Sequence, residues 1–128
     1  MDIKNEQSTF DELVRAFYLM WEKFPEPVTL VHKSKEVVAV NSACRAIGRE
    51  QGMNCAKQGA PEAHRGCLAH KAIQAQQPAW RKSQYGEKEI ISYWLPVPGY
   101  SDFFIHFGVG VTVDYEQMPV MDPVNTEC

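Results

Sequence analysis

The segment 102–114, DFFIHFGVGVTVD, constrains the fold more than any other part of this chain. Its apolar residues alternate with other residues, which is typical of a β-strand with one buried face. We expect the odd-numbered side chains to fill the core, namely Phe103, Ile105, Phe107, Val109, Val111 and Val113. Phe104 and His106 then face away from that core, where a helix from the N-terminal part of the chain would cover them.

Four further strands are predicted in two hairpins. The first hairpin comprises Val28–Lys33 and Glu36–Val40, with Ser34 and Lys35 in the turn. The second has its turn at residues 86–88 and comprises Trp80–Tyr85 and Glu89–Leu95. Prolines after Leu95 are expected to end the second hairpin.

An amphipathic helix is predicted before the first strand. Thr9 and Glu12 form a capping-box pattern, so we expect the helix over Phe10–Lys23, ended by Pro25 and Pro27. Its apolar surface is wider than one buried face requires. Because two-fold dimers are the commonest oligomers, we expect the same helix of a second copy to cover the excess. The residues predicted for this contact are Phe10, Leu13, Val14, Phe17, Met20 and Trp21.

Two helical segments are predicted between the hairpins. Asn41 is placed to cap a short helix, Ser42–Ile47, in which Cys44 is a small core residue. In the stretch Gly52–Ala75, Pro61 is placed to open a longer helix that runs to Ala75. The fold class is therefore α+β, a five-stranded antiparallel sheet with helices on one side plus the N-terminal helix. We expect a lead and helix over 1–24, the domain proper over 25–114 and a tail over 115–128.

Three stretches carry a family resemblance, namely PVTLVHKSKEVVAVNSACRAIG at 27–48, GMNCAKQGAPEAHRGCLAHKAI at 52–73 and the glycine-punctuated last strand. In the order and spacing of these stretches, the sequence from about Phe24 to Asp114 resembles a PAS sensory domain. The second stretch resembles a subgroup in which Gly-x-x-Cys leads to another cysteine at the start of the long helix. The resemblance implies a signalling module that binds haem, flavin, a small metabolite or nothing, and that dimerises through its N-terminal helix. The Asn-Cys-Arg-Phe-Leu motif of the flavin-photoadduct subgroup is absent from the sequence. Of the three possibilities of haem, flavin or an absence of any cofactor, we favour the absence.

The candidate redox or ligand residues lie along the central stretch. On a helical wheel His64, Cys67 and Lys71 share one edge, where the helix N-terminus and the ammonium favour a thiolate. Cys55 precedes the helix and is placed to fold back beside that edge. Three readings stay open: a reversible Cys55–Cys67 disulfide or thiol sensor, a metal site that adds His64 and a fourth ligand, and two packed thiols, which we favour. His70 falls on the opposite side from the buried face, so we expect a solvated residue rather than a haem ligand.

The PAS-like arrangement predicts a pocket between the long helix and the sheet. The residues expected to line it are Val38, Val40, Leu68, Ala72, Ile73, Ile91, Tyr93, Ile105 and Phe107. A ligand there, or oxidation of the thiols, would favour one arrangement of helix against sheet and so alter the dimer surface. The expected function is a stand-alone sensor that signals through its dimer or an effector protein. The alternatives are a ligand-free interaction module with a filled core and, more weakly, a small thiol enzyme using Cys67 with His64.

Composition excludes several other classes of function. The net charge is −3 and no run of Lys and Arg exceeds two, so no nucleic-acid partner is expected. There is no apolar run of 18 residues and no signal-peptide pattern, so we expect a cytoplasmic protein without membrane contact. The sequence contains no GxGxxG, GxxxxGK[ST], HExxH or GxSxG motif, and we expect no catalytic activity.

Overall fold

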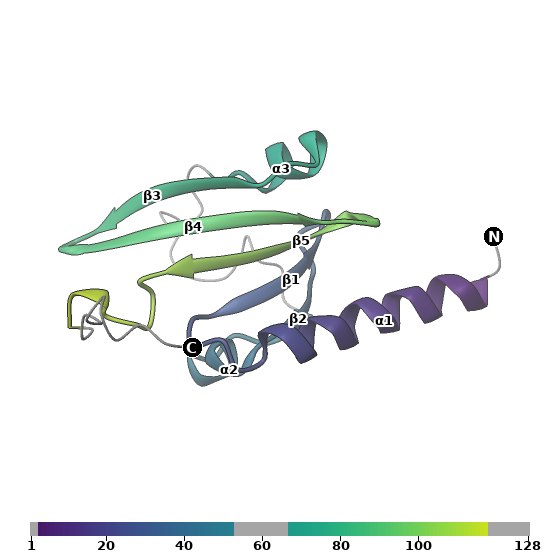
Figure 1. The fold of residues 1–128 in the computed structure, drawn as a ribbon, viewed down its shortest axis with the longest axis horizontal. Coiled ribbons are helices and arrows are strands. Elements are labelled where there is room, and N and C mark those ends of the chain that lie inside the picture. The colour runs from purple at the N-terminus through teal and green to yellow at the C-terminus, as the bar shows by residue number, and fades with distance from the viewer. Residues whose placement is uncertain (1–2, 53–66, 118–128) are drawn as a thin grey trace, which may run out of the picture.

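The computed structural model describes residues 3–52 and 67–117 (Figure 1). Its elements follow one another as α1 (Ile3–Trp21), β1 (Val28–His32), β2 (Val37–Val40), α2 (Ser42–Ala46), α3 (Ala69–Ala75), β3 (Ala79–Tyr85), β4 (Lys88–Val97), β5 (Tyr100–Val109) and the short 3-10 helix η3 (Tyr115–Gln117). None of the helices within these ranges is long and apolar enough to cross a bilayer.

The five strands form one antiparallel sheet in the order β2-β1-β5-β4-β3. The last strand of the chain thus lies in the middle, between the two hairpins. The helices α2 and α3 pack on one face, which we call the inner face, and α1 packs on the other, which we call the outer face. α1 lies over β1 and β2, while α3 contacts β3, β4 and β5 (Figure 1). The predicted α+β fold with a five-stranded antiparallel sheet is confirmed.

The assignment of the two faces of β5 to the helices was wrong. The inner face carries Phe104, which is 1% exposed, and His106, whose ring stacks on Trp94 at 4.9 Å. The odd-numbered Ile105 and Phe107 instead face α1. Since helices cover both sides of the sheet, β5 is apolar on both faces, and alternation alone does not say which helix covers which face.

The predicted continuation of β5 to Asp114 was also wrong. The strand ends at Val109 because Gly110 adopts φ +96°, a conformation that favours glycine. A Cβ atom at position 110 would lie 2.8 Å from the carbonyl oxygen of Glu89. The chain therefore turns away from β4 at this glycine, and Val111 and Val113 lie outside the sheet.

α1 begins well before its predicted start. It covers Ile3–Trp21, so the Thr9 and Glu12 pattern lies inside the helix and does not cap its N-terminus. Leu13 and Phe17 are buried against the sheet, in a cluster with Leu30 and Ile105 of the outer face. Burying these side chains stabilises the packing of α1 on the sheet.

Asn41 caps the start of α2 as predicted, and it also forms hydrogen bonds to β1 and to the end of α1. Its Oδ1 accepts hydrogen bonds from the Cys44 amide at 3.1 Å, which caps α2, and from the Val28 amide at 3.0 Å. Its Nδ2 donates to the carbonyl oxygens of three residues that join α1 to β1, namely Trp21, Phe24 and Glu26. Cys44 is fully buried, as expected. One buried side chain thus fixes the end of α1, the start of β1 and the start of α2 together.

Candidate functional site

α3 packs closely on the inner face because its buried side chains are small. Ala69 and Ala72 are each 1% exposed and belong to the same cluster as Phe104 and Trp94. Two further contacts come from Gln76, which ends the helix with φ +51° and donates from Nε2 to the carbonyl oxygens of Ile73 and Ser101. The C-terminal end of α3 is therefore tied to the start of β5.

A cavity of about 250 Å³ lies at the edge of this face, between the β1–β2 turn, α3 and β5. The side chains of Phe104, Ile73 and Ala69 provide its apolar walls. Its polar groups are all nitrogen-bearing, and come from Lys33, Lys35 and His70. The cavity is smaller than the roughly 300–1,000 Å³ of pockets for drug-sized ligands, so a haem or a flavin would extend well beyond it.

Lys35 is held at this cavity by the turn that carries it. Its backbone has φ +78°, which is uncommon for a residue other than glycine, asparagine or aspartate. The amide of Lys35 donates to the carbonyl oxygen of His32 at 2.8 Å, and the Ser34 amide donates to the ring Nδ1 of His32 at 3.1 Å. Lys35 as a whole is half-buried, and its ammonium lies 5.7 Å from the centroid of the Phe104 ring and 4.0 Å from Sγ of Cys67.

The two lysines of the cavity differ in their partners. Lys33 forms an ion pair with Asp102 at 3.2 Å, and both side chains are about half exposed. Lys35 forms no ion pair within residues 3–52 and 67–117. An aromatic ring and a cysteine sulfur are weak acceptors for an ammonium with three donors. Lys35 therefore retains most of its capacity to bind an anion.

The structure places only part of the predicted redox site. Cys67 is exposed and precedes α3, which begins at Ala69 rather than enclosing Cys67. The ammonium that reaches the Cys67 sulfur is that of Lys35, whereas Lys71 is an exposed residue of α3. Cys55 and His64 lie outside the described residues, so the disulfide and metal readings stay predictions. Among the described residues, no three His, Cys, Asp or Glu side chains are grouped as metal ligands would be. His70 is exposed, as expected, and lies at the rim of the cavity.

The predicted pocket residues do not line one cavity, because the sheet separates them. Val40, Leu68, Ala72 and Ile73 lie on the inner face, whereas Val38, Ile105 and Phe107 belong to the outer cluster. Tyr93 stacks on Phe107 at 5.0 Å and is also on the outer face, and Ile91 pairs with Val109 two residues further along. Ile73 alone of the predicted set lines the cavity at the β1–β2 turn.

The predicted dimer stripe is largely used within the chain. Leu13 and Phe17 are buried, and the rings of Phe10 and Trp21 pack on Phe103 and Phe107 at 5.9 and 5.4 Å. Val14 also packs against the outer cluster. Of the six predicted residues, Met20 is the one that remains widely exposed, at 77%, next to Leu19 at 76%. A self-association surface on α1 would therefore use Met20 of the predicted stripe together with Leu19, which was not predicted.

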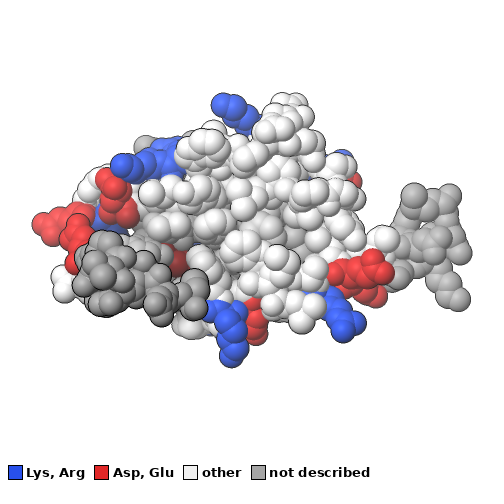
Figure 2. All heavy atoms as spheres, in the orientation of Figure 1, with Lys and Arg blue, Asp and Glu red and all other residues white. Residues whose placement is uncertain are grey.

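The outer face is weakly charged over its centre. Figure 2 shows that Lys, Arg, Asp and Glu lie around the rim of the face on which α1 lies, and that other residues fill the middle. Beyond the reach of α1, Trp80 on β3 is 61% exposed and pairs with the half-buried Tyr93 on β4. Trp80 and Tyr93 thus leave apolar surface uncovered on the part of the outer face that α1 does not reach.

Glu26 is a buried carboxylate that the sequence did not predict to be special. Its side chain is fully buried and accepts five hydrogen bonds, from the backbone amides of Gly110, Thr112 and Val113 and from the hydroxyls of Thr112 and Tyr115. Burial by itself raises the pKa of Glu26, but the hydrogen bonds outweigh it and hold the pKa below the ordinary value of 4.5. The carboxylate thus fixes the segment after β5 to the segment that joins α1 to β1.

No local pattern identifies this cluster. The position of Glu26 between two prolines at the entry to a strand is its one unusual local feature. Its hydrogen-bond donors lie 84 to 89 positions further along the chain. Sequence periodicity does not pair residues at such separations.

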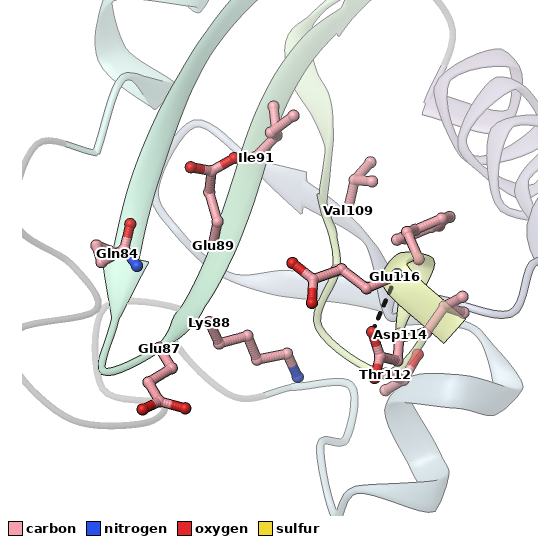
Figure 3. A pocket seen from close by; sticks show the side chains of 12 residues that line it. Gln84, Glu87, Lys88, Glu89, Ile91, Val109, Thr112, Asp114 and Glu116 are labelled. Carbon is pink, nitrogen blue, oxygen red and sulfur yellow. Dashed lines mark hydrogen bonds between the residues drawn. The ribbon is translucent and has the colours of Figure 1, made fainter. Parts of the chain in front are cut away.

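A second, open recess lies between the β3–β4 hairpin and the segment after β5 (Figure 3). Its volume is about 890 Å³, and Ile91 and Val109 contribute apolar surface. The charged groups around it are already engaged in part, since Lys88 donates to the carbonyl oxygen of Val111 and Glu89 pairs with Lys82 at 3.4 Å. The inner-face cavity, where Lys35 has no carboxylate partner among the described residues, is therefore the better candidate for a ligand site.

Comparisons with known proteins identify the fold. No protein-family model matches the chain, and no curated protein matches its sequence.

Solved structures match well. The PAS domain of BvgS from Bordetella pertussis has a TM-score of 0.62 at 16% identity and covers 83% of this chain and 90% of its own. A domain of an HTR-like protein from Haloarcula marismortui has a TM-score of 0.56 at 18% identity, over 69% of this chain and 99% of its own. A sensory box sensor histidine kinase from Vibrio cholerae has the same TM-score at 13% identity, over 87% and 97%. The chain has the PAS fold.

Proposed function

We propose, from the PAS fold that this chain shares with sensory proteins, that it is a non-catalytic signal-sensing domain of the cytoplasm. In this proposal a small molecule binds on the inner face, and the outcome is passed to α1 and to a partner. The observation that carries the proposal is the cavity at the β1–β2 turn, because it joins the apolar walls of a binding site to an ammonium without a carboxylate partner among the described residues.

The hydrogen bonds of Asn41 supply a route from the cavity to α1. The β1–β2 turn carries Lys35, and the two strands that leave it end at Val28 and Val40, next to Asn41. Asn41 bonds both to Val28 and to the carbonyl oxygens of Trp21 and Phe24 at the end of α1. A ligand that shifts this hairpin therefore biases the position of α1, provided that it binds two arrangements with different affinities.

The receiving surface in this proposal is a second copy of the chain. Leu19 and Met20 expose about three quarters of their surface on α1, and Trp80 exposes more than half of its own on the same face. A two-fold contact that covers these side chains would make the dimer sensitive to the angle of α1. An effector protein would then read the state of the dimer.

A response to thiol oxidation at Cys67 belongs to the same proposal. The thiol is exposed and touches Lys35, the residue at the cavity rim. Oxidation would change the polarity of the group beside that ammonium. It would therefore act on the same turn as a ligand.

A ligand-free interaction module is the second candidate. The observation that favours it is the tight packing of α3, whose Ala69 and Ala72 lie directly in the cluster with Phe104 and Trp94. In that case the outer face would be the whole functional surface, and the cavity would have no occupant.

Native mass spectrometry of the protein, isolated without dialysis, distinguishes the two. For a sensor we expect a dimer mass and an added small-molecule mass that disappears on denaturation. The variant Ile73→Trp fills the cavity and should lose the added mass while keeping the dimer. An added mass that Ile73→Trp retains, or none in any preparation, would contradict the sensor and favour the module. A repeat with reductant reports any intramolecular disulfide as a two-dalton shift.

A further inference from the structure

We infer that the cavity at the β1–β2 turn takes a small monoanion with a compact apolar body, such as a carboxylate on a single ring or a short branched chain. This inference deepens the proposed function, on which it rests, by naming the chemical class of ligand. It depends on the charge, the shape and the size of the site.

The charge of the site is positive and concentrated at one atom. Lys35 brings an ammonium to the cavity, and no described residue offers it a carboxylate. Lys33 adds a second ammonium, although Asp102 already neutralises it. A single anionic group on the ligand satisfies this arrangement, because the second lysine is paired within the chain.

The position of the Lys35 ammonium explains why the anion must carry an apolar body. The ammonium lies over the face of Phe104, at 5.7 Å from the ring centroid, so an anion bound to it lies beside an aromatic ring that is otherwise fully buried. Ile73 and Ala69 of α3 form the opposite wall. Because Phe104 and Ala69 are each 1% exposed, the apolar surface left open to water here is chiefly that of the half-buried Ile73. A ring or branched chain would cover that surface, whereas an inorganic anion would not.

The volume limits the size of that body. About 250 Å³ corresponds to the liquid volume of about eight water molecules. One ring with one carboxylate fits this space, whereas a nucleotide or another larger cofactor would extend beyond it. The turn itself is suited to the task, since Lys35 is held with φ +78°, and uncommon backbone conformations of this kind gather at ligand sites.

Benzoate and its neutral counterpart benzamide test the inference at constant ionic strength. We would titrate each into the ¹⁵N-labelled full chain and follow the amide signals of the β1–β2 turn and α3. Benzoate should bind the wild type about tenfold more tightly than benzamide, because only benzoate forms a charge-assisted contact with Lys35. Lys35→Met keeps the side-chain length and removes the charge, and it should weaken benzoate binding about tenfold and leave benzamide binding within twofold.

Lys71→Met is the matched control, since Lys71 is an exposed lysine of α3 that does not line the cavity. It should leave benzoate binding within twofold of the wild type, and both variants should retain the wild-type pattern of dispersed signals. Equal binding of benzoate and benzamide, or equal losses in the two lysine variants, would overturn the anion assignment and leave a ligand-binding cavity in place. Failure of both probes to shift any signal of the turn or α3 would contradict the anion assignment and also the proposed ligand site.

Discussion

The two faces of the sheet are covered in different ways. On the inner face, Val31, Val37 and Phe104 are buried under α2 and α3, and a small cavity lies at the edge. On the outer face α1 covers β1 and β2, while Trp80 of β3 stays exposed. The inner face is thus nearly complete within one chain, and the outer face is not.

This difference suggests a division of roles within the proposed sensor. A closed face with a small, charged cavity suits a small molecule, and an open, weakly charged face suits a macromolecular partner. The segment between α1 and β1 connects the two faces. Asn41 bonds to its carbonyl oxygens, and its own Glu26 accepts hydrogen bonds from the segment after β5. The experiments below either sharpen this contrast or remove it.

The largest expected effect compares two phenylalanines on the same strand. Phe104→Ala opens a cavity under α3 and should lower the free energy of unfolding by about 3–5 kcal/mol. Phe107→Ala removes a half-buried ring that packs with Tyr93, Trp21 and Phe24, so its cost should be about half as large. Urea unfolding of both variants measures the difference. Equal costs would mean that the outer face is as closed as the inner one.

The next effect concerns the link between the two faces. Glu26→Gln keeps one acceptor oxygen but turns an amide N–H₂ towards the backbone donor at the other position, that of Gly110 or that of Thr112, and it should cost about 2 kcal/mol at neutral pH. The exposed Glu87→Gln is the control and should cost less than about 0.5 kcal/mol. A cost for Glu26→Gln no larger than the control's would show that the cluster contributes nothing to stability.

The same variant has a pH signature whose sign follows from the lowered pKa of Glu26. The folded state holds this carboxylate ionised below its ordinary value of 4.5, so its contribution is present above about pH 4.5 and is lost as the pH falls towards the folded pKa. Urea midpoints measured from pH 7 to pH 3 should therefore fall less steeply in Glu26→Gln than in the wild type. Parallel curves would contradict the account of this carboxylate.

The smallest effect concerns the open face. Replacing both Leu19 and Met20 with serine should weaken self-association about tenfold, because it removes two large apolar side chains that are each about three quarters exposed on α1. Folding should be little affected, since neither residue is buried. Glu12→Gln, at another exposed position of α1, is the control. Sedimentation equilibrium gives the association constants, and an unchanged constant in the double variant would place the partner surface elsewhere.

Local sequence patterns were enough to predict most helices and strands of this fold. The features that depend on contacts between distant parts of the chain were not predicted. Asn41 at a helix cap and the alternation along 102–109 are local features, and both predictions succeeded. The assignment of faces failed because β5 is apolar on both sides. The end of β5 depends on Gly110 approaching Glu89, and the partners of Glu26 lie at the other end of the chain. The cavity was placed wrongly for the same reason, since Lys35 meets Phe104 and Cys67 only through the tertiary fold.

Hydrogen exchange of the backbone amides, with and without saturating benzoate, tests most directly whether the inner face communicates with the outer one. The account predicts slower exchange in the β1–β2 turn and α3, where the ligand binds, together with changed exchange across residues 18–28 at the end of α1. It also predicts that Asn41→Ala abolishes the second change and keeps the first. Protection confined to the turn and α3 in the wild type would contradict the account, because the cavity would then bind a ligand without signalling to α1.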